Sequence, residues 1–477
     1  MTVPEGTVIF SAMGNARNTL TCLNRAVKVP AAKEDIAVKK KRLFVYSVDA
    51  LVQEDLAYLK TLPNFSKFLE HASGCENVET IYPSVTYPVH VAIQTGCYPE
   101  KNGIFCNNLF ETDGKGVGWT WDSRLIKSDN IFAAAKRSGY TIGTGFWPVT
   151  AYNKNIDWHL PEYWLAYPTD TFEGTFGEMG ANEDVIRYMQ AHCGHLPPNF
   201  RDTGEENFTD EPGFDAFMVG VACDIIRNHA PEVFFMHGSL IDTYRHQNGL
   251  FNDKVTEGLR QVDEWFGMLQ QAYKDAGVYD ETNFVILSDH GQQDLVRIVK
   301  PNAYLAERGF IKLDETGQVE DYTVYGISNG MSMTFWLKDP DDKDAHNAVY
   351  KALCEMAEDG VYGFNQVFTR AEVAEKFHMD GDFAFVVESD GYTSFADGCT
   401  RPWVSKCDLK DYRMGRATHG YIPTNVPQPV FLAKGPDIRP DVKLDRIKIV
   451  DEGPTFAKLL GVELIGAQGK ALDELLK

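Results

Sequence analysis

Three apolar segments of the chain each lead to an aspartate. LFVYSV leads to Asp49, EVFFMHGSLI leads to Asp242, and NFVILS leads to Asp289 and His290. Each segment is typical of a buried strand, and in an open parallel sheet the functional crevice lies beyond the carboxyl ends of the strands. We therefore expect the carboxylates to converge, and because like charges repel, we expect a cation between them.

Histidines accompany two of these aspartates. Asp242 and His246 are four residues apart, which places both on one face of a helical turn, and His290 follows Asp289 directly at a strand end. Carboxylate oxygen and imidazole nitrogen are ligands that suit zinc or a related transition metal. A single strand-end aspartate more often caps a helix or turn. Three of them, two with a histidine nearby, favour a metal site.

A nucleophile candidate lies in the segment YPSVTYPVHVAIQTG. Thr86 occupies a proline-flanked turn before a helical run, where the amide groups of a helix N-terminus favour an anion. A threonine hydroxyl is a poor nucleophile at neutral pH unless a base or a metal lowers its pKa. The alternative is that Thr86 serves only as the N-cap of the helix. The residues alone leave both interpretations open.

The composition limits the classes of function. The chain has 477 residues, 44% of them hydrophobic, which is enough for one large domain with an insertion or for two domains. Its net charge of -22 argues against binding of nucleic-acid polymers, which requires a basic surface. The charge allows a small anionic phosphoryl substrate, because bound metal cations can invert the local field.

The cellular location is predicted from what the sequence lacks. The nine cysteines include no CxxC pair, so we expect reduced thiols. No segment is long and apolar enough for a membrane span, and the N-terminus lacks the apolar region of a secretory signal. We therefore expect a cytoplasmic protein without membrane contact; the sequence does not predict its oligomeric state.

The elements that must position the candidate residues alternate along the chain. Strand-like segments at TIGTGFW, EVFFMHGSLID and NFVILSDHG alternate with helical stretches over residues 214–228 and 254–277. This order predicts an α/β fold with a doubly wound, mostly parallel sheet. We expect an N-terminal extension (1–41), a catalytic α/β core (42–315), a smaller α/β insertion (316–412) and a C-terminal part of the core (413–477).

Seven motifs follow one another in a familiar order: SVDAL, YPSVTYPVH, TGCYPEKNGI, GFWP, DTYRH, SDHG and THGY. With them the chain resembles the nucleotide pyrophosphatase/phosphodiesterase branch of the alkaline phosphatase superfamily, over about residues 42 to 440. The resemblance implies an alkaline phosphatase-like sheet and two divalent metal ions, zinc for preference. It assigns Asp49, Thr86, Asp289 and His290 to one metal, and Asp242, His246 and His419 to the other.

The resemblance also implies roles that spacing does not provide. His419 is one of twelve histidines and is chosen only through the motif THGY. Asn107, twenty-one residues after Thr86, is expected to donate its amide to a nonbridging phosphoryl oxygen, and Tyr87 to stack on a substrate base. Without the resemblance Asn107 is equally well a turn residue.

Other aromatic residues allow two interpretations, and three segments depart from the family pattern. The aromatic side chains either line a base pocket or pack in the core, which is the more frequent fate. The departures concern the surroundings of the site and therefore the choice of substrate. The aromatic candidates are Trp147, Trp158, Tyr163 and Trp164, and the departures are Pro88-Val89-His90, Met236-His237-Gly238 and Cys106.

Together these features predict a metal-dependent hydrolase that cleaves phosphodiester or pyrophosphate bonds of nucleotide-type substrates through a phosphothreonine at Thr86. Phosphonoacetate hydrolases resemble the chain in the metal set and also use a threonine, so they are the main alternative. A phosphomonoesterase is a further alternative, whereas a sulfatase would need a convertible cysteine at position 86. A metal-poor binding protein without turnover is a remote alternative, which the complete ligand set argues against.

Overall fold

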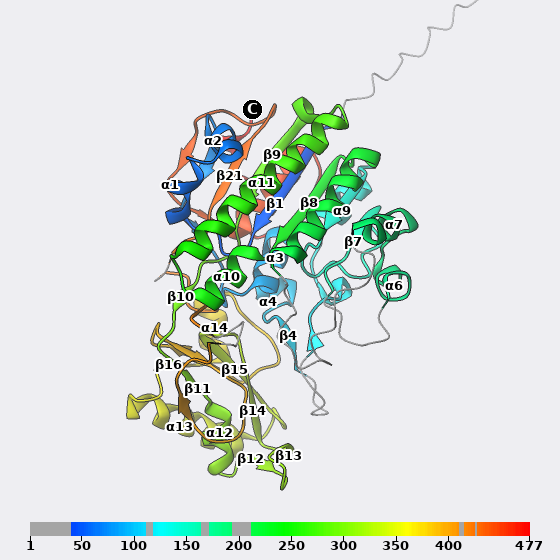
Figure 1. Cartoon of the computed structure of the whole chain (residues 1–477). Coiled ribbons are helices and arrows are strands. Elements are labelled where there is room, and N and C mark those ends of the chain that lie inside the picture. The colour runs from blue at the N-terminus through cyan, green and yellow to red at the C-terminus, as the bar shows by residue number, and fades with distance from the viewer. Residues whose placement is uncertain (1–39, 111–117, 164–170, 193–210, 410–414, 425–426) are drawn as a thin grey trace, which may run out of the picture. The chain divides into compact units, whose positions relative to one another are not determined.

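A computed structural model describes residues 40–110, 118–163, 171–192, 211–409, 415–424 and 427–477 (Figure 1). The predicted N-terminal extension lies outside these ranges up to residue 39, and so does Trp164. None of the helices in these ranges combines the length and the apolar character that crossing a membrane requires.

An eight-stranded, mostly parallel sheet carries the predicted site. Its central strand β1 (Arg42–Val48) pairs in parallel with β8 (Val233–Gly238) on one side and β9 (Thr282–Leu287) on the other. The strand order is β22-β2-β21-β9-β1-β8-β6-β7, in which β21 runs antiparallel to both neighbours. The predicted α/β fold with a mostly parallel sheet is confirmed. The remaining strands are β2 (Ser73–Cys75), β6 (Ile142–Gly145), β7 (Trp158–Leu160), β21 (Phe431–Lys434) and β22 (Lys443–Leu444).

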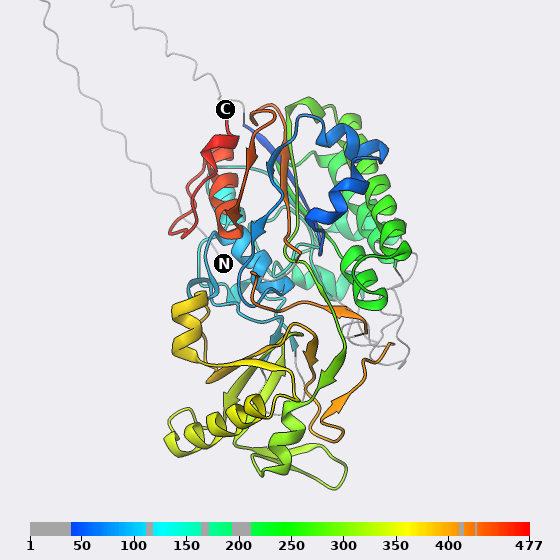
Figure 2. The same cartoon turned by 90° about the vertical axis from the view of Figure 1, so that its left-hand side faces the viewer.

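Helices cover both faces of this sheet. Phe44 and Tyr46 of β1 belong to one core cluster, and Leu43 and Val45 to another, because successive side chains of a strand point to opposite faces. Figure 2 shows green helices on one side of the sheet and the red C-terminal helix on the other. The first cluster includes residues of α2 (Pro63–Leu69), α9 (Gly213–His229) and α11 (Asp253–Asp275), and the second of α3 (Thr86–Thr95), α5 (Ile131–Arg137) and α15 (Glu452–Leu460).

A smaller antiparallel sheet lies in the region predicted as an insertion. Its strand order is β14-β15-β17-β16, and its core cluster includes Tyr304 and Leu305 of α12 (Pro301–Glu307). β12 (Ile311–Leu313) pairs with β13 (Val319–Tyr322), so elements that accompany this sheet begin before residue 316. The other elements are β14 (Val324–Ser328), β15 (Ser332–Leu337), α13 (Lys343–Asp359), β16 (Phe364–Thr369), α14 (Arg370–Phe377) and β17 (Phe385–Ser389).

The strand predicted to end at Asp242 ends earlier. β8 stops at Gly238, and α10 (Leu240–Asn248) places Asp242 in its first turn. Asp215 of α9 explains the break: its carboxylate accepts the N–H groups of Leu240 (3.1 Å) and of the preceding residue (3.2 Å). These acceptors satisfy donors that the start of a helix otherwise leaves unpaired.

Candidate metal and phosphoryl-transfer site

Three predicted ligands meet beyond the carboxyl ends of β1 and β9. Asp49 follows β1 directly, and Asp289 and His290 lie just past β9. Asp49 is 3% exposed, and Asp289 and His290 are 0% exposed. His290 Nε2 lies 3.6 Å from Asp49 Oδ1 and 3.2 Å from Asp289 Oδ2. The structure thus brings these three residues together.

The two buried carboxylates repel each other. Within the described ranges, Asp49 Oδ1 and Asp289 Oδ2 have no hydrogen-bond partner. Burial raises the pKa of Asp49, and the charges of Asp289 and Asp242 raise it further. Burial also raises the pKa of Asp289. A divalent cation between these oxygens would remove the repulsion and stabilise both anions, so the donor set fits a metal.

A second group contains three more of the seven predicted ligands. Asp242 Oδ2 lies 3.0 Å from His246 Nε2, and Asp242 Oδ1 lies 3.8 Å from His419 Nε2. His419 follows the short strand β20 (Ala417–Thr418), which pairs with β10 (Gln293–Asp294). Through this pairing His419 lies near α10, although it is far from Asp242 and His246 in sequence.

The two groups adjoin. The rings of His290 and His419 are stacked with their centroids 3.9 Å apart. Ligand atoms of Asp242, His290 and His419 lie within 4.8 Å of one another, as do those of Asp49, Asp289 and His290. His290 is therefore common to both clusters, whereas the family resemblance assigns it to one metal.

The three histidines are oriented by the main chain. In each, Nδ1 contacts a carbonyl oxygen, which can only accept a hydrogen bond, so Nδ1 carries the proton and Nε2 keeps its lone pair for a metal. Burial lowers the pKa of His290 to about 4 and also lowers that of His419, so both are neutral near pH 7. The contacts are His246 to Ala417 (2.7 Å), His290 to Gly291 (3.2 Å) and His419 to Ser84 (3.1 Å).

Thr86 is the first residue of α3 and lies against the first group. Its Oγ1 is 3.3 Å from His290 Nε2. The side chain is half-buried. A hydroxyl at a helix N-terminus, next to nitrogen and carboxylate ligands, is placed both to bind a metal and to attack an anion held by the helix amides.

Asn107 is held at the start of the same helix. Its Oδ1 accepts the N–H of Tyr87 at 2.9 Å, and its main-chain oxygen accepts the N–H of Thr120 at 2.8 Å. The first bond assigns the side-chain oxygen to the protein and leaves Nδ2 as the donor of the amide. This arrangement is compatible with the predicted contact to a phosphoryl oxygen.

Residues 43–422 match the family model of type I phosphodiesterase / nucleotide pyrophosphatase. The chain belongs to this family. The match contains every predicted ligand from Asp49 to His419, and the predicted family is confirmed.

Two relatives within the family are longer than this chain. Ectonucleotide pyrophosphatase/phosphodiesterase family member 1 of Mus musculus is 25% identical over 281 residues, which cover 56% of this chain and 26% of the relative. The venom phosphodiesterase of Naja atra is 21% identical over 451 residues, 91% of this chain and 46% of the relative. The chain therefore spans less than half the length of either relative.

Solved structures share the fold. Murine ectonucleotide pyrophosphatase/phosphodiesterase 5 gives a TM-score of 0.62 at 18% identity, covering 92% of this chain and 100% of the murine one. An inactive threonine-to-alanine form of the murine protein in complex with AMP gives the same values. The likeness confirms the predicted alkaline phosphatase-like fold.

Tyr87 has no open ring face. It is 1% exposed and belongs to a core cluster with Val91 and Val149. Its ring lies 5.4 Å from that of Trp119. A ring covered in this way leaves no face on which a substrate base could stack, and the predicted role of Tyr87 stays a prediction.

The other aromatic candidates of the described ranges also pack against protein. Trp147 is fully buried. The ring of Trp158 stacks on His229 at 4.5 Å, and that of Tyr163 lies 4.5 Å from Trp121. Core packing, one of the two interpretations of this stretch, agrees with these contacts.

Two histidines near the site were not predicted. His90 Nδ1 donates to the main-chain oxygen of Thr86 (2.8 Å), so its Nε2 accepts from the Ser47 hydroxyl (2.8 Å). Burial and the neighbouring His237 lower the pKa of His90 to about 3. His237 Nε2 lies 3.4 Å from Asp49 Oδ2. Both histidines lie in segments that depart from the family pattern. This departure was the only feature of the sequence that could have indicated them as residues near the site.

Gln292 is a third residue that the sequence analysis missed. It is buried, and its Nε2 donates to the main-chain oxygen of Asp242 at 3.0 Å and to the carboxylate of the same residue. The contact orients Asp242 within the second group. Gln292 lies two residues after His290, so proximity in sequence could have indicated it.

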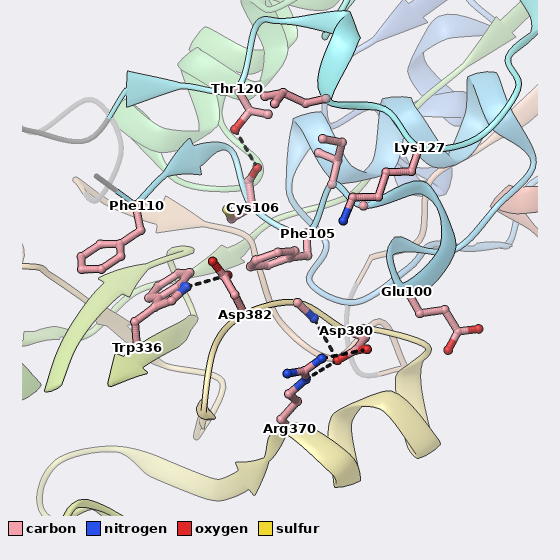
Figure 3. Close-up of a pocket in the computed structure, with 14 residues that line it drawn as sticks. Glu100, Phe105, Cys106, Phe110, Thr120, Lys127, Trp336, Arg370, Asp380 and Asp382 are labelled. Carbon is pink, nitrogen blue, oxygen red and sulfur yellow. Dashed lines mark hydrogen bonds and ion pairs between the residues drawn. The ribbon is translucent and has the colours of Figure 1, made fainter. Parts of the chain in front are cut away.

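A cavity of about 560 Å³ opens between the segment around Cys106 and the smaller sheet (Figure 3). The stacked rings of Phe110 and Trp336, 5.1 Å apart, form part of its wall, and Trp336 Nε1 donates to Asp382 at 2.9 Å. Burial raises the pKa of the Cys106 thiol to about 12. Its lining contains no predicted metal ligand, so this cavity and the metal site are different places.

Proposed function

We propose that the chain is a metal-dependent phosphohydrolase that cleaves phosphodiester or pyrophosphate bonds of nucleotide-type substrates, with Thr86 as the nucleophile. The observation that carries the proposal is the 3.3 Å contact between Thr86 Oγ1, at a helix N-terminus, and His290 Nε2. His290 Nε2 lies within 3.6 Å of two buried carboxylates, each with one oxygen that has no hydrogen-bond partner in the described ranges. Membership of the type I phosphodiesterase / nucleotide pyrophosphatase family supports the reaction class.

The donor atoms suit two divalent metal ions, zinc for preference. Three carboxylates and one threonine alkoxide carry four negative charges, which two dications neutralise. When bound, the ions would lower the pKa of the threonine hydroxyl and offset negative charge on the phosphoryl group. One ion would be held by Asp49, Thr86, Asp289 and His290, and the other by Asp242, His246 and His419.

The reaction has two displacements at phosphorus. First, Thr86 Oγ gives up its proton and bonds to phosphorus, while the bond to the leaving oxygen breaks. The leaving group departs with that electron pair and takes up a proton. The Asn107 amide donates to a nonbridging oxygen and stabilises the charge that develops there. Water then attacks the phosphothreonine, the bond from Oγ to phosphorus breaks, and Thr86 regains its proton. Each turnover consumes one water and releases a phosphomonoester and the leaving group.

The nucleotide-type substrate is supported by a relative. The murine family member solved in complex with AMP is an inactive threonine-to-alanine form. AMP is a nucleoside monophosphate, which is the kind of product that cleavage of a nucleotide diester or pyrophosphate releases. We extend both points to this chain as part of the proposal.

The test compares three substrates in one zinc-supplemented buffer: bis(4-nitrophenyl) phosphate, 4-nitrophenyl phosphate and phosphonoacetate. Faster turnover of the diester supports the proposal. Faster turnover of phosphonoacetate or of the monoester would show that the proposed substrate class is wrong. If no substrate were hydrolysed faster than in buffer alone, a binding protein without turnover would be favoured.

The nucleophile is tested in the same assay. Thr86→Ala should lower diester turnover by at least about a thousandfold, as loss of a nucleophile does elsewhere, while zinc is still bound by the remaining ligands. Thr86→Ser is the matched control and should keep measurable activity. Near-normal turnover in Thr86→Ala would overturn the assignment.

A further inference from the structure

Arg245 is completely buried and is surrounded by acceptors. Its Nη2 donates to both carboxylate oxygens of Asp55, at 2.7 and 2.8 Å. Nη1 donates to the main-chain oxygen of Ala50, and Nε to that of Leu250 at 3.1 Å. A guanidinium without solvent contact needs such a set of acceptors, because an unpaired buried charge is strongly destabilising.

The contacts of Arg245 join the two groups of predicted ligands. On α10, Arg245 lies between the aspartate and the histidine of the second group. Its acceptor Ala50 directly follows Asp49, and the Ala50 N–H donates to Asp289 Oδ1 at 3.2 Å. One side chain therefore connects the helix that carries Asp242 and His246 with the turn that begins at Asp49.

That turn is strained and needs support. Ala50 has a φ of 56°, in the left-handed region that residues other than glycine rarely adopt. Such a conformation persists when its surroundings fix it, and here both the N–H and the oxygen of Ala50 are bonded. Asp55 adds a further constraint, since its Oδ2 accepts the N–H of Val52 at 2.9 Å.

We propose that the Arg245–Asp55 ion pair is a positioning device for the metal ligands. The pair holds α10 against the turn after β1. It thereby sets the distance between the ligands on α10 and Asp49, and with it the geometry of both metal positions. The inference rests on the proposed function, because it takes these ligands to bind metal. A merely structural ion pair would contribute to stability and leave zinc affinity unchanged.

The experiment measures zinc affinity of the full chain by competition with a chromophoric chelator. Arg245→Met removes the guanidinium and keeps the length of the side chain, and Asp55→Asn keeps the volume of its partner. The double variant Arg245→Met/Asp55→Leu leaves no unpaired charge and should fold even where a single variant does not. We expect zinc affinity about 10- to 100-fold weaker in each, as for other groups that orient metal ligands.

Leu353→Ala is the matched control for loss of stability. Leu353 is fully buried in α13, in the core of the smaller sheet, and is none of the predicted ligands or their partners. This variant should unfold at a lower temperature and bind zinc as the wild type does. An equal loss of zinc affinity in Leu353→Ala would overturn the inference, since general destabilisation would then account for the effect.

The remaining outcomes separate the inference from the proposed function. Wild-type zinc affinity in the double variant and in Asp55→Asn would overturn the positioning role while the metal site stands. A wild-type chain that binds neither zinc nor another divalent metal ion would refute the proposed function itself, before any variant is compared.

Discussion

The side-chain carboxyl group of Glu388 accepts a hydrogen bond from the Tyr82 hydroxyl at 2.9 Å and so joins the smaller sheet to the segment that leads to Thr86. Its other oxygen accepts the N–H of Ile422 at 2.8 Å, three residues after His419. Glu388 lies on β17 and is buried. One residue of the smaller sheet therefore contacts both the nucleophile segment and the segment of the last histidine ligand.

Loss of this carboxylate should reduce turnover. We expect Glu388→Ala to lower kcat on the diester by about a hundredfold, the size of effect that a small displacement of reacting groups produces. Glu388→Gln keeps the shape and a hydrogen-bonding end, so it should stay closer to wild type. Glu358→Ala, at an exposed position of α13, is the control. Equal kcat in Glu388→Ala and this control would contradict the prediction.

Glu388 should also make the free energy of unfolding depend on pH. Burial raises the pKa of Glu388 from 4.5 to about 8. Between these values the folded chain holds a proton that the unfolded chain has lost, so the contribution to stability is complete below pH 4.5 and is lost as the pH rises towards 8. Urea unfolding of metal-loaded wild type and Glu388→Gln at several pH values should show a smaller decline in the variant. If the free energy of unfolding declined equally with pH in both proteins, Glu388 would not be the cause of the decline.

Removal of metal should destabilise the chain. Without cations, the buried carboxylates of Asp49 and Asp289 repel each other, which lowers the free energy of unfolding. Ligand linkage predicts a loss of about 4 kcal/mol if the metal had been present at a thousand times its Kd. The melting temperature should fall with a chelator and recover with zinc, and the shift should be smaller in Asp289→Asn. A melting temperature indifferent to the chelator would argue against a metal site.

Asn107 should act on kcat more than on KM. Removal of one preorganised donor to a developing charge costs about 10² to 10³ in rate, and we expect this for Asn107→Ala. Asn107→Asp is an informative companion, because it can still accept the N–H of Tyr87 but cannot donate. If the aspartate variant turned over diester like wild type, the residue would be only a support for the helix.

The local sequence pattern alone was sufficient to predict part of the site. The apolar runs before Asp49 and Asp289 predicted strands that the structure contains, because burial on both faces leaves a signature in consecutive residues. The run before Asp242 was interpreted as one strand, since the cap from Asp215 that starts α10 comes from a different helix. His419 carried no local signal and was found only through a motif.

Other properties depend on contacts between residues far apart in sequence. Arg245 and Asp55 are 190 positions apart, so composition gave no hint that they form a buried pair. The burial of Tyr87 depends likewise on which rings pack over it. The predicted domain boundaries, the individual site roles and the cytoplasmic location stay predictions.

Strand β1 also restricts how this protein can change in length. Phe44 and Tyr46 fill one core while Leu43 and Val45 fill the other, and the ligand Asp49 follows directly after this seven-residue strand. Because side chains alternate with a period of two, a deletion or insertion of one residue within β1 would exchange the two sets of side chains and move the ligand out of place. Substitutions of similar size in β1 should therefore be tolerated far better than any indel.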